Sequence, residues 1–123
     1  AGVPGEKYNV GGNAERTNLQ MVDALCDALE RLAPAASNAA LRAAGFTRYH
    51  DLKTFVADRP GHDRRYAIDA TKISRELGFA PSRTFEEGIQ QTVAWYLANR
   101  GWCSAVTRDT YDRQRLGLEA RTK

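Results

Sequence analysis

The sequence predicts a small mixed α/β domain in which a short parallel β-α-β unit is followed by two helices. Three observations support this prediction. An apolar segment, an amphipathic segment and a second apolar segment follow one another within residues 6–57, which is the order of a right-handed parallel crossover. S/T-x-x-E/Q capping boxes at Thr17 and Thr84 mark two helix starts. The 123 residues are enough for one modest hydrophobic core.

The first half of the predicted unit is a strand and a helix. Residues 6–10, EKYNV, read as a short strand that is closed by the glycine pair 11–12. The capping box at Thr17 then opens a helix over residues 18–32, whose apolar residues recur every three or four positions. Cys26 falls in this apolar pattern and is expected to be a small core residue.

The rest of the chain supplies a second strand and two helices. Residues 33–44 are rich in alanine and predict a surface connection, and residues 52–57, LKTFVA, predict the second strand. A short helix is expected over residues 70–77. The helix that starts after Thr84 is expected to end near Gly101.

The composition restricts the kind of partner. Arginine accounts for 14 of the 18 cationic residues, and its planar group favours bidentate binding of phosphate or carboxylate. The net charge of +3 is too small to indicate nucleic acid by itself. The two cysteines form neither a disulfide framework nor a zinc motif, so a reducing, cytoplasmic setting is expected. No apolar run reaches the length of a membrane span.

A charged loop is the strongest candidate for a binding site. Residues 57–69, ADRPGHDRRYAID, follow the predicted second strand, and open α/β sheets place ligands at the carboxyl ends of their strands. Pro60 and Gly61 shape the backbone, so that Arg59 and His62 offer donors suited to a diphosphate. The alternative is a solvated loop whose charges pair with one another, which contributes little to stability.

Asn18 points to the same ligand from a second position. It lies in the first turn of the predicted helix 18–32, where free N–H groups attract phosphate. In a parallel β-α-β unit this helix start and the loop 58–65 emerge at one edge of the sheet, so the two converge. Alone, Asn18 would be an ordinary helix-start residue.

Five further residues are given no role in binding or catalysis. Asn9 and Tyr66 are expected to support packing and the backbone. His50 is expected to be a surface histidine. Tyr49 and Lys53 form a Tyr-x-x-x-Lys pattern, but no glycine fingerprint precedes it and it runs into the predicted strand. The pattern is therefore attributed to chance.

Longer motifs resemble a known family. The run "VADRPGHDRRYAID", together with "YNVGG", "TNLQ", "KISRELGF.P" and "TFEEGI..TV.WYL.N", resembles the carboxyl-terminal part of the dTDP-glucose 4,6-dehydratases. These enzymes belong to the extended short-chain dehydrogenase/reductase family. The resemblance runs from about Gly5 to Trp102, and DRPGHDRRYAID is highly specific for it. The tail departs from the pattern, since Tyr111 is its last aromatic residue.

The resemblance implies a fragment of a larger enzyme. Residues 1–103 would be its substrate-binding domain and residues 104–123 a polar tail. Arg59 would be the chief phosphate ligand, and Arg64 and Arg65 are expected in structural ion pairs. The substrate-binding residues implied are Asn18, Asp58, Arg59, Pro60, Gly61 and His62.

The resemblance also implies a chemistry that this chain does not complete. The family converts dTDP-glucose to dTDP-4-keto-6-deoxyglucose with loss of water, using tightly bound NAD. The dinucleotide fingerprint and the catalytic residues lie in an amino-terminal domain, and no G-x-G-x-x-G occurs here. The chain is therefore expected to be inactive alone, with no catalytic, cofactor-binding or metal-binding residue. Its expected partners are dTDP-glucose, the missing domain and, in the full-length enzyme, a second subunit of a homodimer.

Two other readings stay open. The chain could belong to a related nucleotide-sugar epimerase, decarboxylase or reductase. It could also be a stand-alone module that binds phosphate or nucleic acid. Against the second reading, the cations are scattered and only Tyr66 lies near the loop, which gives no base-stacking platform. Neither nucleic acid nor a membrane is expected as a partner.

Overall fold

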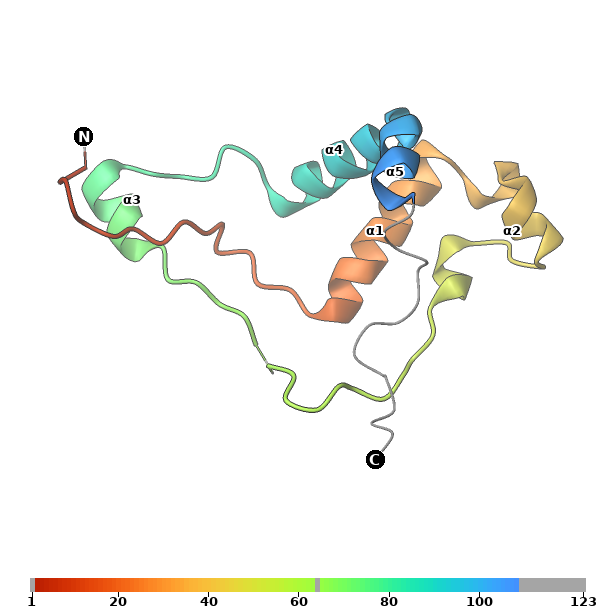
Figure 1. Ribbon diagram of the computed structural model, residues 1–123, viewed down its shortest axis with the longest axis horizontal. Helices are drawn as coiled ribbons and strands as arrows, with labels where there is room; N and C mark the ends of the chain where they lie inside the picture. Colours follow the sequence, from red (N-terminus) through yellow and green to blue (C-terminus); the bar gives the residue numbers. More distant parts are fainter. Residues whose placement is uncertain (1, 64, 109–123) are drawn as a thin grey trace.

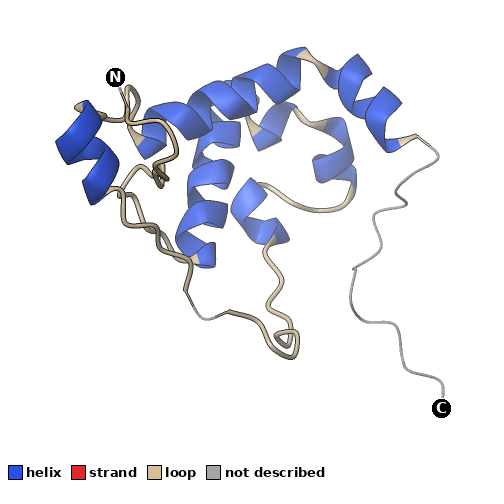
Figure 2. Cartoon of the chain, turned by 60° about the vertical axis from the view of Figure 1, so that its left-hand side comes forward, coloured by secondary structure: helices blue, strands red, loops and turns tan. Residues whose placement is uncertain are grey.

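The computed structural model describes residues 2–63 and 65–108, and this part of the chain consists of helices and loops. Figure 2 shows the helices in blue and the connecting loops in tan. The elements in chain order are α1 (Asn18–Leu32), the 3-10 helix η1 (Ala35–Ser37), α2 (Ala39–Ala43), the 3-10 helix η2 (Tyr49–Leu52), α3 (Thr71–Leu77), α4 (Phe85–Ala98) and α5 (Arg100–Thr107).

The predicted β-α-β unit is not confirmed, because no strand occurs within residues 2–63 and 65–108. Residues 6–10 and 52–57 were expected to be its strands. A strand exists only where a neighbouring strand accepts and donates its backbone hydrogen bonds. The apolar pattern of each segment predicts an exposed or buried face, but it does not supply that neighbour.

The amino-terminal segment instead lies beside the chain that leads into α3. Figure 1 shows the red segment and the green segment running near one another. The Asn9 side-chain amide donates to the backbone oxygen of Asp69 at 3.4 Å. A Cβ placed on Gly11 would lie 3.3 Å from the side chain of Ile68, so the absence of a side chain permits this approach. The expected supporting role of Asn9 is confirmed.

Helix α1 begins and ends as the sequence predicts. The Thr17 hydroxyl accepts from the Gln20 amide at 3.1 Å, and the Gln20 side chain accepts from the Thr17 amide at 2.8 Å. The box satisfies two amide groups that the first turn leaves unpaired. Cys26 and Ala28 of this helix are buried, which confirms Cys26 as a core residue, and burial raises the pKa of its thiol.

Helix α4 packs against α1 and begins with the second capping box. The Thr84 hydroxyl accepts from the Glu87 amide at 3.2 Å, and the Glu87 carboxylate accepts from the Thr84 amide at 2.9 Å. The helix ends at Ala98 rather than near Gly101. At that point the Asn99 side chain donates to the Trp95 carbonyl at 2.8 Å, and a separate helix, α5, follows.

The starts of α1 and α4 are tied together by Arg16. Its guanidinium lies 3.1 Å from the Glu86 carboxylate and 5.0 Å from the centre of the Phe85 ring. Both partners belong to the first turn of α4. The contact holds Asn18, two residues after Arg16, at a fixed place next to α4.

The described residues bury little apolar surface of their own. The large hydrophobic side chains of Phe55, Val56 and Tyr66 are more than half exposed. The Trp95 ring makes edge contacts with the rings of Tyr96 and Trp102, with 5.2 Å between ring centres in each pair. All three residues nevertheless stay about half exposed. No helix in the described part is long and apolar enough to cross a membrane. The buried residues are Cys26, Ala28, Ala35, Ala70, Ile73 and Val93.

Removing either capping hydroxyl should destabilise the fold by a similar amount. Thr17→Ala and Thr84→Ala should each lower the free energy of unfolding by about 1 kcal/mol, because each leaves a first-turn amide without its partner. Chemical unfolding of the purified protein measures the change. Thr107→Ala is the control, since its hydroxyl bonds the Cys103 carbonyl inside a helix and caps no amide. Equal stability of all three variants would contradict the capping role.

Candidate functional site

The segment Arg59–His62 folds into a tight turn. The His62 amide donates to the Arg59 carbonyl at 3.3 Å. Gly61 has a φ of 70°, and Pro60 precedes it. A proline at the second position and a left-handed glycine at the third define a type II turn. The sequence therefore fixes the local backbone, since few other residue pairs adopt these angles without strain.

The Asp58 carboxylate locks this turn from one side. One of its oxygens accepts from the Arg59 amide at 2.8 Å and lies 2.6 Å from Nδ1 of His62. The hydrogen bond from His62, followed by the one from the Arg59 amide, lowers the pKa of Asp58. The carboxylate is thus ionised near neutral pH and can only accept, so Nδ1 of His62 carries a hydrogen.

The locked histidine faces the start of α1 across an open hollow of about 580 Å³. Asn18, Asp58 and His62 line this first hollow, so the structure brings together three of the predicted site residues. Its remaining lining is mostly apolar and comes from Leu19, Val22 and residues 52–57. This apolar wall was not predicted, because the same residues were attributed to a helix core and a strand.

A second hollow of about 640 Å³ shares part of its lining with the first. Asn18 and His62 line it as well, together with Asp63, Tyr66 and the segment 15–20. Arg65 also lines this hollow and pairs with Glu15, which confirms the ion pair expected for Arg65. Arg64 lies outside the described residues.

The remaining predicted site residues form the turn itself and line neither hollow. These are Arg59, Pro60 and Gly61. Arg59 forms no ion pair with any residue in the ranges 2–63 and 65–108. Arg16 and Arg65, by contrast, are each paired with a glutamate. The guanidinium of Arg59 thus has no carboxylate partner in the described part of the chain.

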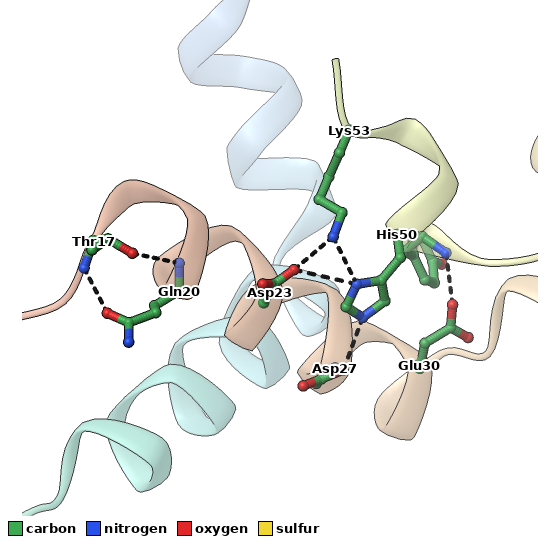
Figure 3. Close-up of polar contacts among 8 residues, drawn as sticks. Thr17, Gln20, Asp23, Asp27, Glu30, His50 and Lys53 are labelled. Carbon is green, nitrogen blue, oxygen red and sulfur yellow. Dashed lines mark hydrogen bonds and ion pairs between the residues drawn. The ribbon is translucent and has the colours of Figure 1, made fainter. Parts of the chain in front are cut away.

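A charged cluster on α1 fixes where this loop begins. Figure 3 shows Lys53 and His50 reaching the carboxylates of Asp23 and Asp27 on α1. His50 belongs to η2, and Lys53 directly follows it. Lys53 Nζ lies 2.7 Å from Asp23, and His50 Nε2 lies 2.8 Å from Asp27. Glu30, one turn further along α1, accepts from the Tyr49 amide at 2.6 Å. We call these six residues the α1–η2 cluster.

His50 was expected to be a surface histidine, and its side chain is partly buried in a charged cluster rather than free. Its side chain is only 17% exposed and also lies 3.4 Å from the Asp23 carboxylate and 3.3 Å from Lys53 Nζ. The residues around His50 in the sequence cannot reveal such packing, because the carboxylates belong to a helix more than twenty positions earlier in the chain. Both residues of the Tyr-x-x-x-Lys pattern also make contacts that hold the fold together. The Tyr49 hydroxyl donates to the Ala33 carbonyl at 2.9 Å, and Lys53 pairs with Asp23.

The groups around the two hollows are of the kind that can form a cradle for an anion, and they lie beside an apolar wall. A helix start, an amide side chain, an imidazole and an unpaired guanidinium can each interact with phosphate oxygens. In the described part of the chain, no group of three His, Cys, Asp or Glu side chains could hold a metal ion.

Comparison with known proteins shows the family. The model of the family described as GDP-mannose 4,6 dehydratase matches residues 3–92. The chain belongs to this family. The match confirms, at the level of the family, the resemblance seen in the sequence motifs.

Curated relatives give a more specific likeness. The chain is 51% identical over 116 residues to the dTDP-glucose 4,6-dehydratase of Neisseria meningitidis serogroup B, which covers 94% of this chain and 31% of that protein. It is 52% identical over 110 residues to the enzyme of the same name from Salmonella typhimurium, which covers 89% of this chain and 28% of that protein. The chain thus spans less than a third of the length of these relatives.

A solved structure is similar as well. The crystal structure of dTDP-glucose 4,6-dehydratase from Bacillus anthracis, in complex with NAD, matches with a TM-score of 0.57 and 39% identity. The match covers 77% of this chain and 24% of that one.

The Lys53–Asp23 pair should make stability fall in acid. The hydrogen bond from Lys53 lowers the pKa of Asp23 below its ordinary value, which is about 3.9 in unfolded chains. A carboxyl with a lower pKa in the folded state stabilises above the unfolded value, and this contribution disappears as the pH falls through the folded pKa. Asp23→Asn should therefore flatten the loss of stability between about pH 5 and pH 2.

Unfolding midpoints measured across that range test the effect. Asp63→Asn removes the same charge outside the α1–η2 cluster and serves as the control. A wild-type curve that is as flat as that of Asp23→Asn would contradict the role given to the pair.

Gly61→Ala should loosen the turn. The φ of 70° at Gly61 costs an alanine about 1–2 kcal/mol, and no neighbouring atom lies within 4 Å to add a clash. The His62 amide should then exchange with solvent about 5- to 30-fold faster, as hydrogen exchange by NMR can measure. Gly12→Ala is the matched control, since Gly12 also has open space and has no positive φ. Equal exchange rates in both variants would contradict the turn assignment.

Proposed function

We propose that this chain is the carboxyl-terminal, dTDP-glucose-binding part of an NAD-dependent dTDP-glucose 4,6-dehydratase. The complete enzyme converts dTDP-glucose to dTDP-4-keto-6-deoxyglucose with loss of water. The likeness to enzymes of that name from several bacteria supports this proposal. So does one observation in the structure: Asn18 and His62, more than forty residues apart in the sequence, line the same two hollows.

In this proposal the cradle holds the diphosphate of the substrate. Arg59 is the chief phosphate ligand, His62 and Asn18 contact phosphate or sugar oxygens, and Asp58, Pro60 and Gly61 complete the binding segment. The charge of Arg59 is not neutralised by a described carboxylate, which favours a dianionic ligand. Holding the diphosphate orients the glucose toward the catalytic groups, and such positioning can account for several kcal/mol of barrier reduction.

We assign the rest of the chemistry to the part of the enzyme outside this chain. That part binds NAD and carries the catalytic residues, since no dinucleotide fingerprint occurs here. The fragment is therefore inactive alone. We propose that residues 1–103 form the substrate-binding domain and that 104–123 form a tail, of which residues 104–107 belong to α5. We further propose that the complete enzyme works in the cytoplasm as a homodimer and binds neither nucleic acid nor membranes.

We also propose that the predicted strands form in the complete enzyme. Residues 6–10 and 52–57 would then pair with strands from the missing part. The exposed side chains of Val10, Phe55 and Val56 support this, because they present apolar surface without a cover in the described chain.

Arg59→Ala in the complete enzyme should weaken dTDP-glucose binding about 10- to 100-fold, because a charge-assisted hydrogen bond to phosphate contributes about 1.5–3 kcal/mol. Bound NAD should be retained. Isothermal titration calorimetry measures the affinity, and absorbance of the released nucleotide measures the NAD content.

Arg31→Ala is the matched control, because Arg31 lies in the last turn of α1, about 20 Å along the helix from Asn18. Unchanged affinity in Arg59→Ala would refute the assignment. Titration of the wild-type enzyme with GDP-mannose tests the nucleotide class: tighter binding of GDP-mannose than of dTDP-glucose would contradict the proposed substrate.

A further inference from the structure

An ion pair joins the two sides of the second hollow. The Arg65 guanidinium donates to the carboxylate of Glu15. Both residues line that hollow, as do Asn18 and His62. Glu15 lies three positions before Asn18, and Arg65 lies three positions after His62. Because three residues span at most about 10 Å, the ion pair is attached close to both of these side chains.

We propose that Glu15 and Arg65 are positioning residues whose ion pair sets the separation between Asn18 and His62. This inference rests on the proposed function, in which Asn18 and His62 contact the ligand. It goes beyond that function because neither Glu15 nor Arg65 touches the ligand. Each of them acts through the segment that it holds, so that the width of the cradle fits the diphosphate.

In the described part of the loop, no other ion pair makes this connection. Among residues 58–63 and 65–66, the remaining hydrogen bonds and ion pairs run within the turn Arg59–His62 and to the adjacent Asp58. Toward the amino terminus, the nearest described ion pair to another element is that of Lys53, nine positions before His62. Without Arg65 and Glu15, no described ion pair would tie the turn to the start of α1.

The Glu15 side of the pair is itself held in place. The adjacent Arg16 donates to the Glu15 carbonyl at 3.0 Å. The same guanidinium lies 3.1 Å from the Glu86 carboxylate on α4. The backbone at residues 15 and 16 therefore has a defined place beside α4. Arg65 reaches this fixed point from the loop, so the ion pair places the loop relative to α1.

The exposure of the two side chains argues against a role in folding alone. Arg65 is 71% exposed and Glu15 is 50% exposed, and ion pairs at such exposed positions contribute little to stability. A loop with few buried contacts, however, changes its position at a small cost in free energy. We therefore expect the pair to affect the affinity for the ligand and to leave global unfolding nearly unchanged.

The ion pair also balances charge beside the proposed anion. An unpaired Glu15 carboxylate in the wall of the second hollow would repel a diphosphate, whereas an unpaired Arg65 would attract one. In the pair the two charges offset each other. A variant that removes both charges together thus keeps this balance and loses only the connection, which separates positioning from simple attraction.

Isothermal titration calorimetry of the complete enzyme with dTDP-glucose tests the proposal. Glu15→Gln/Arg65→Met keeps the length of both side chains and the net charge, but it removes the ion pair because methionine has no N–H donor. Glu15→Arg/Arg65→Glu exchanges the two charges and can form the pair again. Glu6→Gln/Lys72→Met is the matched control, because it removes an ion pair between residues that line neither hollow.

We expect Glu15→Gln/Arg65→Met to bind dTDP-glucose about 3- to 5-fold more weakly than the wild-type enzyme, within the range of an exposed ion pair. Glu15→Arg/Arg65→Glu and the control should bind like the wild-type enzyme. In about 0.5 M NaCl the difference between the wild-type enzyme and Glu15→Gln/Arg65→Met should shrink, since salt screens exposed charges. The unfolding midpoints of the wild-type enzyme and the two variants of the pair should agree.

Three results would overturn the inference alone. Wild-type affinity in Glu15→Gln/Arg65→Met would show that the pair does not position the ligands. Weak binding by both variants of the pair would assign Glu15 or Arg65 a direct contact with the ligand, because an exchange of charges cannot preserve such a contact. A lowered unfolding midpoint that accompanies the weaker binding would indicate a structural role only. Failure of the wild-type enzyme to bind dTDP-glucose would instead refute the proposed function itself.

Discussion

The candidate site depends on the attachment of η2 to α1 through the α1–η2 cluster. Lys53 and His50 reach carboxylates that lie one helical turn apart on α1, at 2.7 and 2.8 Å. No strand ladder in residues 2–63 and 65–108 holds the following chain in place. The cluster therefore holds the end of η2 on α1, and residues 54–58 lead from there to the turn Arg59–His62.

Two local devices then complete the cradle. The capping box at Thr17 and the contact of Arg16 with Glu86 fix the start of α1. The type II turn and the Asp58 carboxylate fix the orientation of His62. The capping box and the turn act within a few residues, whereas Arg16 and Glu86 lie 70 positions apart in the sequence. An anion-binding group that is already in place needs little rearrangement when its ligand arrives, which favours affinity.

Local features of the sequence predicted local structure well. Both capping boxes, the bounds of α1 and the bent loop around Pro60 and Gly61 follow from the preferences of a few neighbouring residues. Long-range placement could not be predicted in the same way. The apolar run 52–57 shows an extended segment but not its partner, and His50 shows nothing of the carboxylates on α1 that surround it. Both depend on contacts between distant parts of the chain.

A crystal structure of the complete enzyme with dTDP-glucose bound would test the central claim most directly. We expect the diphosphate oxygens to lie within hydrogen-bond distance of His62 Nε2 and of the Asn18 side chain, with the Arg59 guanidinium closing over them. A diphosphate bound elsewhere, with protein side chains filling the space between Asn18 and His62, would contradict it.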